Sequence, residues 1–326
     1  MRVSLSALIL LAACQPVVPA SEDTGESPVD DTGTPTTDDT GDTDTDDTDT
    51  DDTDTDDTGD TDDTGDTDEP HKVDCDNPAE LPIEFDTELG YSTAEDFTFD
   101  EFGNLIATRN GNLVAYSGPS EFEIIAPGFG EMAGTSILAN GDYILASPYN
   151  GTVLRVTPEG GQTNILTGVA YPNGVTVGTD GYVYVSGHTF GDIYQVDPDT
   201  ADFTIIADDI EGANGMAFSP DGQTLYTCSF YDGTVWSIDR DGKGGWEEPV
   251  LMGRFPGWAG LDGLNVDECG MIYVTEYIAG IVWRIDPEAE EFEPEQVATL
   301  PSYWIPNLHW GRGVGEFSLD LSLIHI

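Results

Sequence analysis

Short apolar runs separated by polar turns fill the chain from about residue 75 onward. The runs are four to six residues long and rich in Val, Ile, Tyr and Trp, and dipeptides such as Asp-Gly and Asn-Gly separate them. Runs of this length between such turns are typical of β-strands, and no stretch keeps an amphipathic period over a helical length. The pattern predicts an all-β region over residues 75–326.

The turn glycines recur at a nearly constant period. Successive spacings of 38, 40, 41, 48 and 45 residues separate Gly103, Gly141, Gly181, Gly222, Gly270 and Gly315. A repeat of this length with three or four strands per unit is the sequence signature of a β-propeller, and about 250 residues at this period predict six blades. A two-sheet sandwich also has short strands, but it would not repeat the whole strand-turn-strand unit.

A polar residue stands eight positions before most of these glycines. The six positions are Glu95, Ala133, Asn173, Asn214, Asp262 and Asn307. Each precedes the strand that a propeller places innermost, and an equal phase in the repeat means an equal height along the axis. We therefore expect the polar side chains to face one another at one end of the central channel. The alternative is that Asn or Asp before Gly simply forms turns.

The composition of this set indicates a cation. Carboxylates and amides crowded together need a cation or a water network to offset charge repulsion and lost hydration. Oxygen ligands without His or Cys suit a hard cation such as calcium or magnesium. The sequence therefore predicts one divalent cation in the channel.

Two segments of the chain resemble the six-bladed propellers of the regucalcin (senescence marker), gluconolactonase and luciferin-regenerating-enzyme family. They are NGMAFSPDGQTLYTCSFYDGTVWSID and LDGLNVDECGMIYVTEY. The resemblance covers roughly residues 90–290. It implies one bound divalent cation, calcium first, with magnesium, manganese or zinc as alternatives, and hydrolysis of a lactone. By position, Glu95, Asn214 and Asp262 match the metal ligands of the family, Asp262 also matches its catalytic base, and Asn173 matches an Asn that contacts metal or substrate.

The chain departs from the family in two respects. Asp96 stands where the family usually has Gly, and the arginines that grip substrate have no clear counterpart in residues 110–150. The favoured function is a metal-dependent lactone or ester hydrolase, with Asp262 as ligand and base and with His188 and Asn307 as further substrate contacts. The alternative is a non-catalytic propeller that binds a ligand or a protein partner.

Three residues occupy matching places after the second strand of their repeats. They are His188, Phe230 and Tyr277, and Glu276 is a spare carboxylate beside them. An aromatic-walled pocket is one interpretation, and packing between blades is the favoured one. For His188 the functional interpretation is a proton shuttle, and the structural one is a residue at the channel rim.

The N-terminus, MRVSLSALILLAACQ, has one Arg, an apolar core and small residues before a Cys. This is a signal-peptide pattern, too short for a membrane-spanning helix. Leu11-Ala12-Ala13-Cys14 resembles a bacterial lipobox, which makes residues 1–13 the signal peptide and Cys14 the lipidated first residue. An ordinary secretory signal is the alternative. Two or three acyl chains hold a protein stably on a bilayer, and Gln15 favours the outer membrane, so we expect a lipoprotein of the bacterial cell envelope.

Residues 14–74 form a segment of another kind. Within residues 21–69 nearly every residue is Asp, Thr or Gly, 23 are acidic, and none is Lys, Arg or aromatic. Because such a segment cannot bury enough apolar surface and its charges repel, we predict a disordered, extended stalk. The net charge of -55 excludes nucleic acid as a partner. A monomer that takes a small-molecule substrate or ligand is expected.

The cysteines and the C-terminus complete the sequence predictions. An odd count of three after Cys14 allows one internal bridge in an exported protein, and we expect Cys75 to pair with Cys269 and Cys228 to stay free. Residues 82–86 are expected to supply the outer strand of the sixth blade. The chain stops at DLSLIHI, about 20 residues short of a full repeat. We therefore expect an incomplete last blade with an open edge, and SLIHI to lie outside the fold.

Overall fold

The computed structural model describes residues 7–11, 75, 81, 85–89, 91, 95–257, 260–300, 304–314 and 321–325; for 7–11, 85–89 and 321–325 it describes the backbone alone. The chain divides into one unit of residues 1–14 and 73–326 and a second unit of residues 15–72. The predicted stalk and Cys14 lie outside the described residues, as does Gly315.

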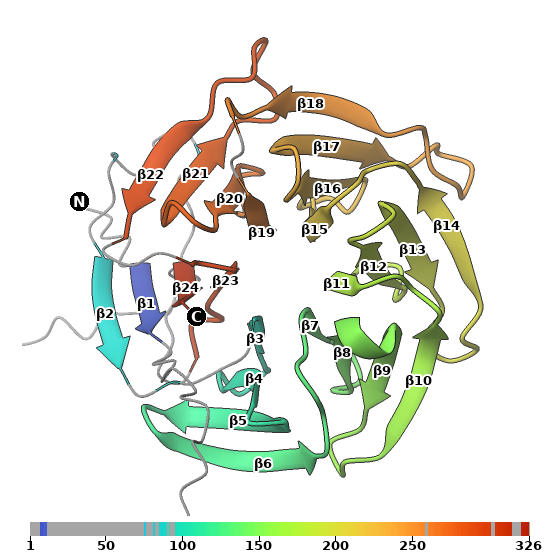
Figure 1. The fold of residues 1–326 in the computed structure, drawn as a ribbon, viewed down its shortest axis with the longest axis vertical. Helices are drawn as coiled ribbons and strands as arrows, with labels where there is room; N and C mark the ends of the chain where they lie inside the picture. The colour runs from blue at the N-terminus through green and yellow to red at the C-terminus, as the bar shows by residue number, and fades with distance from the viewer. Residues whose placement is uncertain are drawn as a thin grey trace, which may run out of the picture. The chain divides into compact units, whose positions relative to one another are not determined.

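Within the described residues, five blades of four strands each surround a common axis (Figure 1). In each blade every strand pairs antiparallel with the next one along the chain, and the first strand lies innermost. The predicted all-β propeller is confirmed, but the described residues form five blades of this kind and not the six that the repeat predicted. The blades are β3 (Phe97–Phe99), β4 (Leu105–Arg109), β5 (Asn112–Gly118) and β6 (Glu121–Pro127); β7 (Thr135–Ile137), β8 (Tyr143–Ser147), β9 (Thr152–Val156) and β10 (Gln162–Thr167); β11 (Pro172–Val177), β12 (Val183–Gly187), β13 (Asp192–Val196) and β14 (Phe203–Ala207); β15 (Ala213–Phe218), β16 (Thr224–Ser229), β17 (Thr234–Asp239) and β18 (Val250–Arg254); and β19 (Leu261–Val266), β20 (Ile272–Glu276), β21 (Ile281–Ile285) and β22 (Glu295–Thr299).

The periodic glycines join the first and second strands of these five blades. Each N–H donates to the carbonyl oxygen three residues earlier, and each φ lies between +69° and +89°. This is the left-handed region, which glycine adopts without steric cost. The residues are Gly103, Gly141, Gly181, Gly222 and Gly270. The glycine period in the sequence therefore reflects one type of turn that recurs once in each of these five blades.

The core lies in layers between neighbouring blades. Every residue of β8 and of β12 is buried, because both faces of a second strand are covered by adjacent blades. Ile144 and Val153 of one blade pack in the same cluster as Val175 and Val185 of the next. The outer strand β6 is exposed over its first four residues. Burial is thus greatest in the strands that support the axis-facing residues.

A sheet of different construction occupies the sixth position (Figure 1). Its order is β2-β1-β24-β23, from β1 (Ala7–Leu11), β2 (Phe85–Leu89), β23 (Asn307–Trp310) and β24 (Leu321–His325). β23 and β24 are antiparallel, whereas β1 runs parallel to both β2 and β24. β2 is the outer strand expected near residues 82–86. The expectation that SLIHI lies outside the fold was wrong, since an apolar run of this length suits a strand and residues 321–325 pair with β23.

Cys75 is bonded to Cys269, in the turn between β19 and β20. The predicted pairing is present, and Cys228 is free and buried as expected. One turn of 3-10 helix, η1 (Pro148–Asn150), interrupts the strands. No helix in the described part of the chain has the length and apolar character to cross a membrane.

Asp96 connects three of the sheets. Its buried carboxylate accepts hydrogen bonds from the N–H of Phe97 in β3 (2.8 Å), from the N–H of Thr135 in β7 (2.6 Å) and from the side-chain amide of Asn307 in β23. Nε2 of His309, also in β23, lies 3.1 Å from the same carboxylate. Hydrogen bonds to an ionised acceptor are stronger than neutral ones. Asp96 therefore joins the first blade to the C-terminal strands.

Asp96→Ala is expected to lower the free energy of unfolding by about 2–4 kcal/mol, because buried donors lose an ionised acceptor. Asp100→Ala is the matched control, since the hydrogen bonds described for Asp100 come from Phe102 and Asn104 in its own turn. Urea denaturation of both variants measures the difference. An equal loss in the two variants would contradict a closing role for Asp96.

Candidate functional site

Asn173, Asn214 and Asp262 lie inside strands, as the second residues of β11, β15 and β19. In each strand the pairing register shifts at this point, in β11 between Pro172 and Val175. Such a bulge bends a strand and re-aims a side chain, and bulges are common beside functional sites. The alternative that these residues simply form turns was wrong.

The glycine that follows each of these residues lets neighbouring inner strands approach closely. A Cβ on Gly174 would overlap the carbonyl oxygen of Asn214, and a Cβ on Gly215 would lie 2.6 Å from the carbonyl oxygen of Asp262. Cβ atoms essentially never come within 3.0 Å of another heavy atom. The Asn-Gly and Asp-Gly pairs therefore set the spacing between the axis-facing residues.

Side chains of the second strands fix the same backbone positions. Oγ of Ser186 donates to the carbonyl oxygen of Asn214 at 2.8 Å, and the thiol of Cys228 lies 3.1 Å from the carbonyl oxygen of Asp262. Burial raises the pKa of Cys228, so that it stays a neutral thiol. Strands β12 and β16 thus hold the backbone of the axis-facing residue in the following blade.

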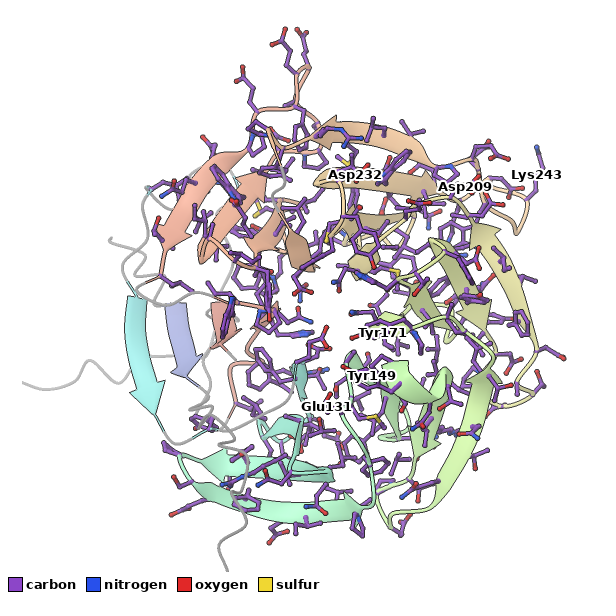
Figure 2. The ribbon with its side chains drawn as sticks, in the orientation of Figure 1. Glu131, Tyr149, Tyr171, Asp209, Asp232 and Lys243 are labelled. Carbon is purple, nitrogen blue, oxygen red and sulfur yellow. A yellow bond between two sulfur atoms is a disulfide. The ribbon has the colours of Figure 1, made fainter. Side chains whose placement is uncertain are left out.

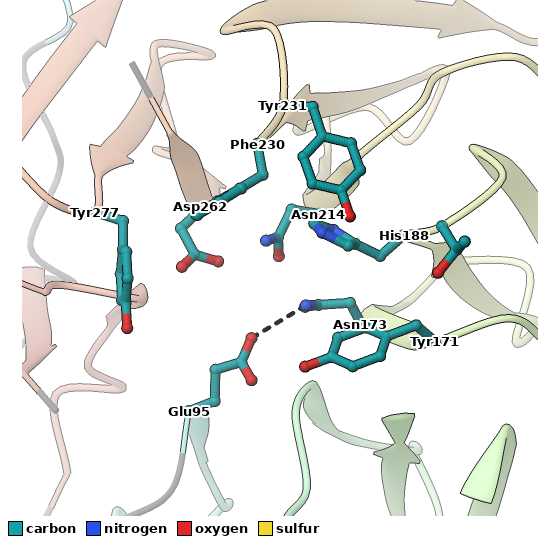
Figure 3. Close-up of a pocket in the computed structure, with 10 residues that line it drawn as sticks. Glu95, Tyr171, Asn173, His188, Asn214, Phe230, Tyr231, Asp262 and Tyr277 are labelled. Carbon is teal, nitrogen blue, oxygen red and sulfur yellow. Dashed lines mark hydrogen bonds between the residues drawn. The ribbon is translucent and has the colours of Figure 1, made fainter. Parts of the chain in front are cut away.

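These inner strands converge on a cavity of about 400 Å³ (Figure 3). Five of the six residues predicted for catalysis, metal or substrate line it, together with residues that the sequence did not single out. The lining comprises Glu95, Tyr171, Asn173, His188, Thr189, Asn214, Phe230, Tyr231, Asp262 and Tyr277. We call Glu95, Asn173, Asn214 and Asp262 the polar cluster.

Asn307, the sixth predicted residue, is not among the lining residues. Its amide nitrogen donates to Asp96, and its Oδ1 accepts from the N–H of Leu308 at 2.8 Å. The phase of the repeat places Asn307 at the start of an inner strand as expected, but a neighbouring carboxylate engages its side chain. This geometry gives Asn307 no contact with the cavity.

Glu95 and Asp262 supply the acidic groups of the polar cluster. Nδ2 of Asn173 donates to Oε1 of Glu95 at 3.1 Å (Figure 3). Burial raises the pKa of Glu95 to about 7, against the opposing effect of this hydrogen bond. Burial also raises the pKa of Asp262 well above its usual value, the charge of Glu95 adds to this, and a hydrogen bond with Asn214 opposes it. Without a positively charged partner, burial thus disfavours the ionised form of both carboxyl groups.

A divalent cation fits this donor set chemically. Two carboxylates and two amide oxygens are hard ligands, and a positive charge between them would reverse the effect of burial on both pKa values. Within the described chain, no three His, Cys, Asp or Glu side chains are grouped to hold a metal. A cation here would therefore depend on the amides of Asn173 and Asn214 as well as on the two acids.

The metal-free chain is expected to lose stability as pH rises from about 5 to 7. The folded state raises the pKa of Glu95 from 4.5 to about 7, so in this window it holds a proton that the unfolded chain has released. Stability therefore falls with rising pH, on the order of 2 kcal/mol in total. Urea denaturation in a chelating buffer measures the slope. Glu95→Gln should reduce the slope, since the raised pKa of Asp262 still contributes, and an unchanged slope in that variant would contradict the assignment.

Aromatic side chains surround the polar cluster (Figure 3). Ring centroids lie 5.6 Å apart for Tyr171 and His188, 4.8 Å for His188 and Tyr231, and 5.9 Å for Phe230 and Tyr277. We call these five residues the aromatic cluster. His188, Phe230 and Tyr277 contact one another between blades and also line the cavity, so both interpretations made from the sequence hold. Tyr171 and Tyr231 were missed, although each stands within two residues of a predicted position.

His188 sits in the middle of the aromatic cluster. Burial lowers its pKa, against the opposing effect of a hydrogen bond with the backbone of Ala213. Its Nδ1 is buried and has no hydrogen-bond partner among the described residues. The imidazole is therefore neutral near pH 7.

Other groups noted nearby have separate places. Glu276 accepts a hydrogen bond from Nε1 of Trp283 at 2.9 Å and is not among the lining residues. Figure 2 shows Glu131, Tyr149 and Tyr171 on the axis-facing side of the blades, and the Tyr149 and Tyr171 rings are 5.7 Å apart. The charge of Glu131 contributes to the raised pKa of Glu95. The surroundings of the cavity are therefore acidic as well as aromatic.

Residues 167–307 match the family model described as the SMP-30/Gluconolactonase/LRE-like region. The match covers 141 of the 326 residues and includes Asn173, His188, Asn214 and Asp262, but not Glu95. The resemblance seen in the sequence is confirmed.

Solved structures share the fold. A gluconolactonase from Xanthomonas campestris superposes with a TM-score of 0.54 at 16% identity over 68% of this chain and 82% of that one. The calcium-binding protein regucalcin from Agrobacterium tumefaciens gives 0.55 at 18% over 66% and 77%. Virginiamycin B lyase from Staphylococcus aureus gives 0.56 at 14% over 70% and 76%. No curated protein sequence matches the chain. At these identities the solved structures show only that the chain is a β-propeller. The family model adds that residues 167–307 are similar to the SMP-30/Gluconolactonase/LRE-like region.

Proposed function

We propose that the chain is a divalent-cation-dependent hydrolase of a lactone or similar ester, with the polar cluster as the cation site. The observation that carries this is the convergence of Glu95, Asn173, Asn214 and Asp262 on one cavity. The family-model match supports it, and so does the structural likeness to the calcium-binding protein regucalcin. Calcium is the favoured cation, and magnesium, manganese and zinc are alternatives.

Each residue of the polar cluster has a distinct part in this proposal. A bound divalent cation polarises an ester carbonyl and lowers the pKa of a water molecule. Asp262 would be both a ligand and the proton acceptor, because its carboxylate lines the cavity together with that of Glu95. Asn173 orients Glu95 through the 3.1 Å hydrogen bond, and Asn214 holds the Asp262 side chain. The ring of His188 lines the cavity and would contact the substrate.

A substrate panel tests the proposal. Aldonolactones, homoserine lactones, aryl lactones and phosphotriesters are assayed with calcium, magnesium, manganese or zinc, and a chelator serves as control. We expect turnover of at least one lactone that the chelator abolishes. Cation or ligand binding without turnover of any member would instead support a non-catalytic propeller that binds a ligand or a protein partner.

We also propose that the protein is a monomeric lipoprotein of the outer membrane, anchored through Cys14. Cys14→Ala is expected to move it from the membrane fraction to the soluble fraction while the propeller stays folded, because the acyl chains that hold it on the bilayer are lost. Fractionation with a circular dichroism spectrum of the released protein measures both. Membrane partition that does not change in Cys14→Ala would reject the anchor. Processing before Cys14 would also remove β1, which lies between β2 and β24.

A further inference from the structure

We infer that the cavity selects an uncharged lactone fused to or carrying an aromatic ring, and discriminates against sugar lactones and anionic esters. This deepens the proposed hydrolase function and rests on it for the ester group. The ester would lie at the polar cluster and the aromatic ring against the aromatic cluster.

The aromatic cluster is continuous and comes from three consecutive blades. Tyr171 precedes β11 and His188 follows β12, Phe230 and Tyr231 follow β16, and Tyr277 follows β20. The His188 ring also lies 5.8 Å from the Phe230 ring, so the contacts run from Tyr171 to Tyr277 without a break. Aromatic pairs at such separations are favourable beyond the area they bury. A flat ring of a ligand extends this set of contacts at low cost.

Tyr171 has an unusual backbone conformation, which is consistent with a role in ligand binding. Tyr171 has a φ of +60°, a left-handed conformation that is uncommon for a residue other than glycine. The N–H of His188 donates to its carbonyl oxygen at 3.0 Å and helps hold it there. Strained residues of this kind concentrate at ligand sites. The strain brings the Tyr171 ring into the cavity lining.

Charge determines which ligands are disfavoured. None of the described lining residues is Lys or Arg, whereas Glu95 and Asp262 both line the cavity. One divalent cation would neutralise these two acids and leave no surplus for a phosphate or carboxylate on the substrate. Glu131 adds a further negative charge close to Glu95. An anionic substrate would therefore enter without a partner for its charge.

Polarity and size narrow the substrate further. A sugar lactone brings several hydroxyl groups that lose water and need hydrogen-bond partners, and half of the lining residues are aromatic. The volume of about 400 Å³ is at the lower end of the range for small-molecule sites, roughly 300–1,000 Å³. A two-ring lactone is of suitable size.

Binding and turnover are measured separately. The full chain is titrated with 3,4-dihydroquinolin-2-one, a lactam that resembles the aryl lactone dihydrocoumarin but resists hydrolysis, and turnover is assayed with dihydrocoumarin, glucono-1,5-lactone and its 6-phosphate. We expect the lactam to bind, and Phe230→Leu and Tyr277→Leu to weaken it at least tenfold with unchanged melting temperatures. Phe203→Leu is the matched control, since Phe203 is half exposed on the outer strand β14. This variant should bind the lactam with the affinity of the wild type.

The outcomes separate the inference from the proposed function. Lactam binding that depends on the aromatic cluster, without turnover of any lactone, supports the aromatic selectivity and rejects the hydrolase. Turnover of glucono-1,5-lactone in preference to dihydrocoumarin keeps the hydrolase and overturns the inference. Lactam affinity that is equal in wild type, Phe230→Leu and Tyr277→Leu also overturns it.

Discussion

Asp262→Asn is expected to abolish cation-dependent hydrolysis, with a loss in kcat/KM of at least about 10³-fold, because one change removes both a charged cation ligand and the general base. The side chain keeps its size, so the hydrogen bond with Asn214 and the backbone contact with Cys228 can persist. Steady-state kinetics with the best substrate of the panel, at saturating calcium, measures the effect. Unchanged melting temperature shows that the loss is chemical.

Glu276→Gln is the matched control for this variant. Glu276 is a carboxylate in the same blade, at the end of β20, but it bonds to Trp283 and is not among the cavity-lining residues. Its neutralisation should leave kcat/KM within about twofold, because its side chain bonds to Trp283 and does not line the cavity. A tenfold or smaller loss in Asp262→Asn would contradict the role of Asp262 as base.

Gly215→Ala is expected to lower the free energy of unfolding by about 3 kcal/mol or more, because overpacking against backbone cannot be relieved by a rotamer change. The added methyl group would overlap the backbone N of Leu264 and lie 2.6 Å from the carbonyl oxygen of Asp262. The same shift would displace Asp262, so cation affinity should fall as well. Chemical denaturation and calcium titration measure the two effects.

Gly130→Ala is the control for the glycine prediction. A Cβ at Gly130 would meet no atom within 4 Å, and its φ is not in the left-handed region. This change should leave stability within about 0.5 kcal/mol. A similar small effect for Gly215→Ala would show that the inner strands can separate, and that the Asp-Gly and Asn-Gly pairs do not set their spacing.

The repeat made the fold and most of the polar cluster predictable. Turn glycines with one φ region and one hydrogen-bond pattern recur once per blade, so equal phase meant equal height. Glu95, Asn173, Asn214 and Asp262 follow from that phase alone. The position of a residue within the repeat determines where its Cα lies, however, and does not determine which neighbour its side chain contacts. Asn307 has the right phase and bonds to Asp96, a contact between residues 211 apart that no local pattern contains.

Other features could not be read from local patterns for similar reasons. Asn-Gly is a turn signal in isolation, but here the contact between neighbouring inner strands requires Gly in an extended segment. Tyr171 lines the cavity because of an uncommon φ, which its residue type disfavours. The sheet at the sixth position contains β1 between β2 and β24, and this parallel pairing has no periodic signal. Apart from the Cys75–Cys269 disulfide, the sequence was informative where one geometry repeats and uninformative where a contact occurs once.

Calorimetric titration with calcium tests the central claim, that the polar cluster is a cation site. The full chain is compared with a Glu95→Gln/Asp262→Asn double variant, so that any calcium bound by the acidic residues 21–69 is the same in both. We predict one saturable site per chain in the wild type that is absent from the double variant, and a smaller loss of affinity in Asn173→Ala or Asn214→Ala, which remove a neutral ligand. Superimposable isotherms for the wild type and the double variant would contradict the account.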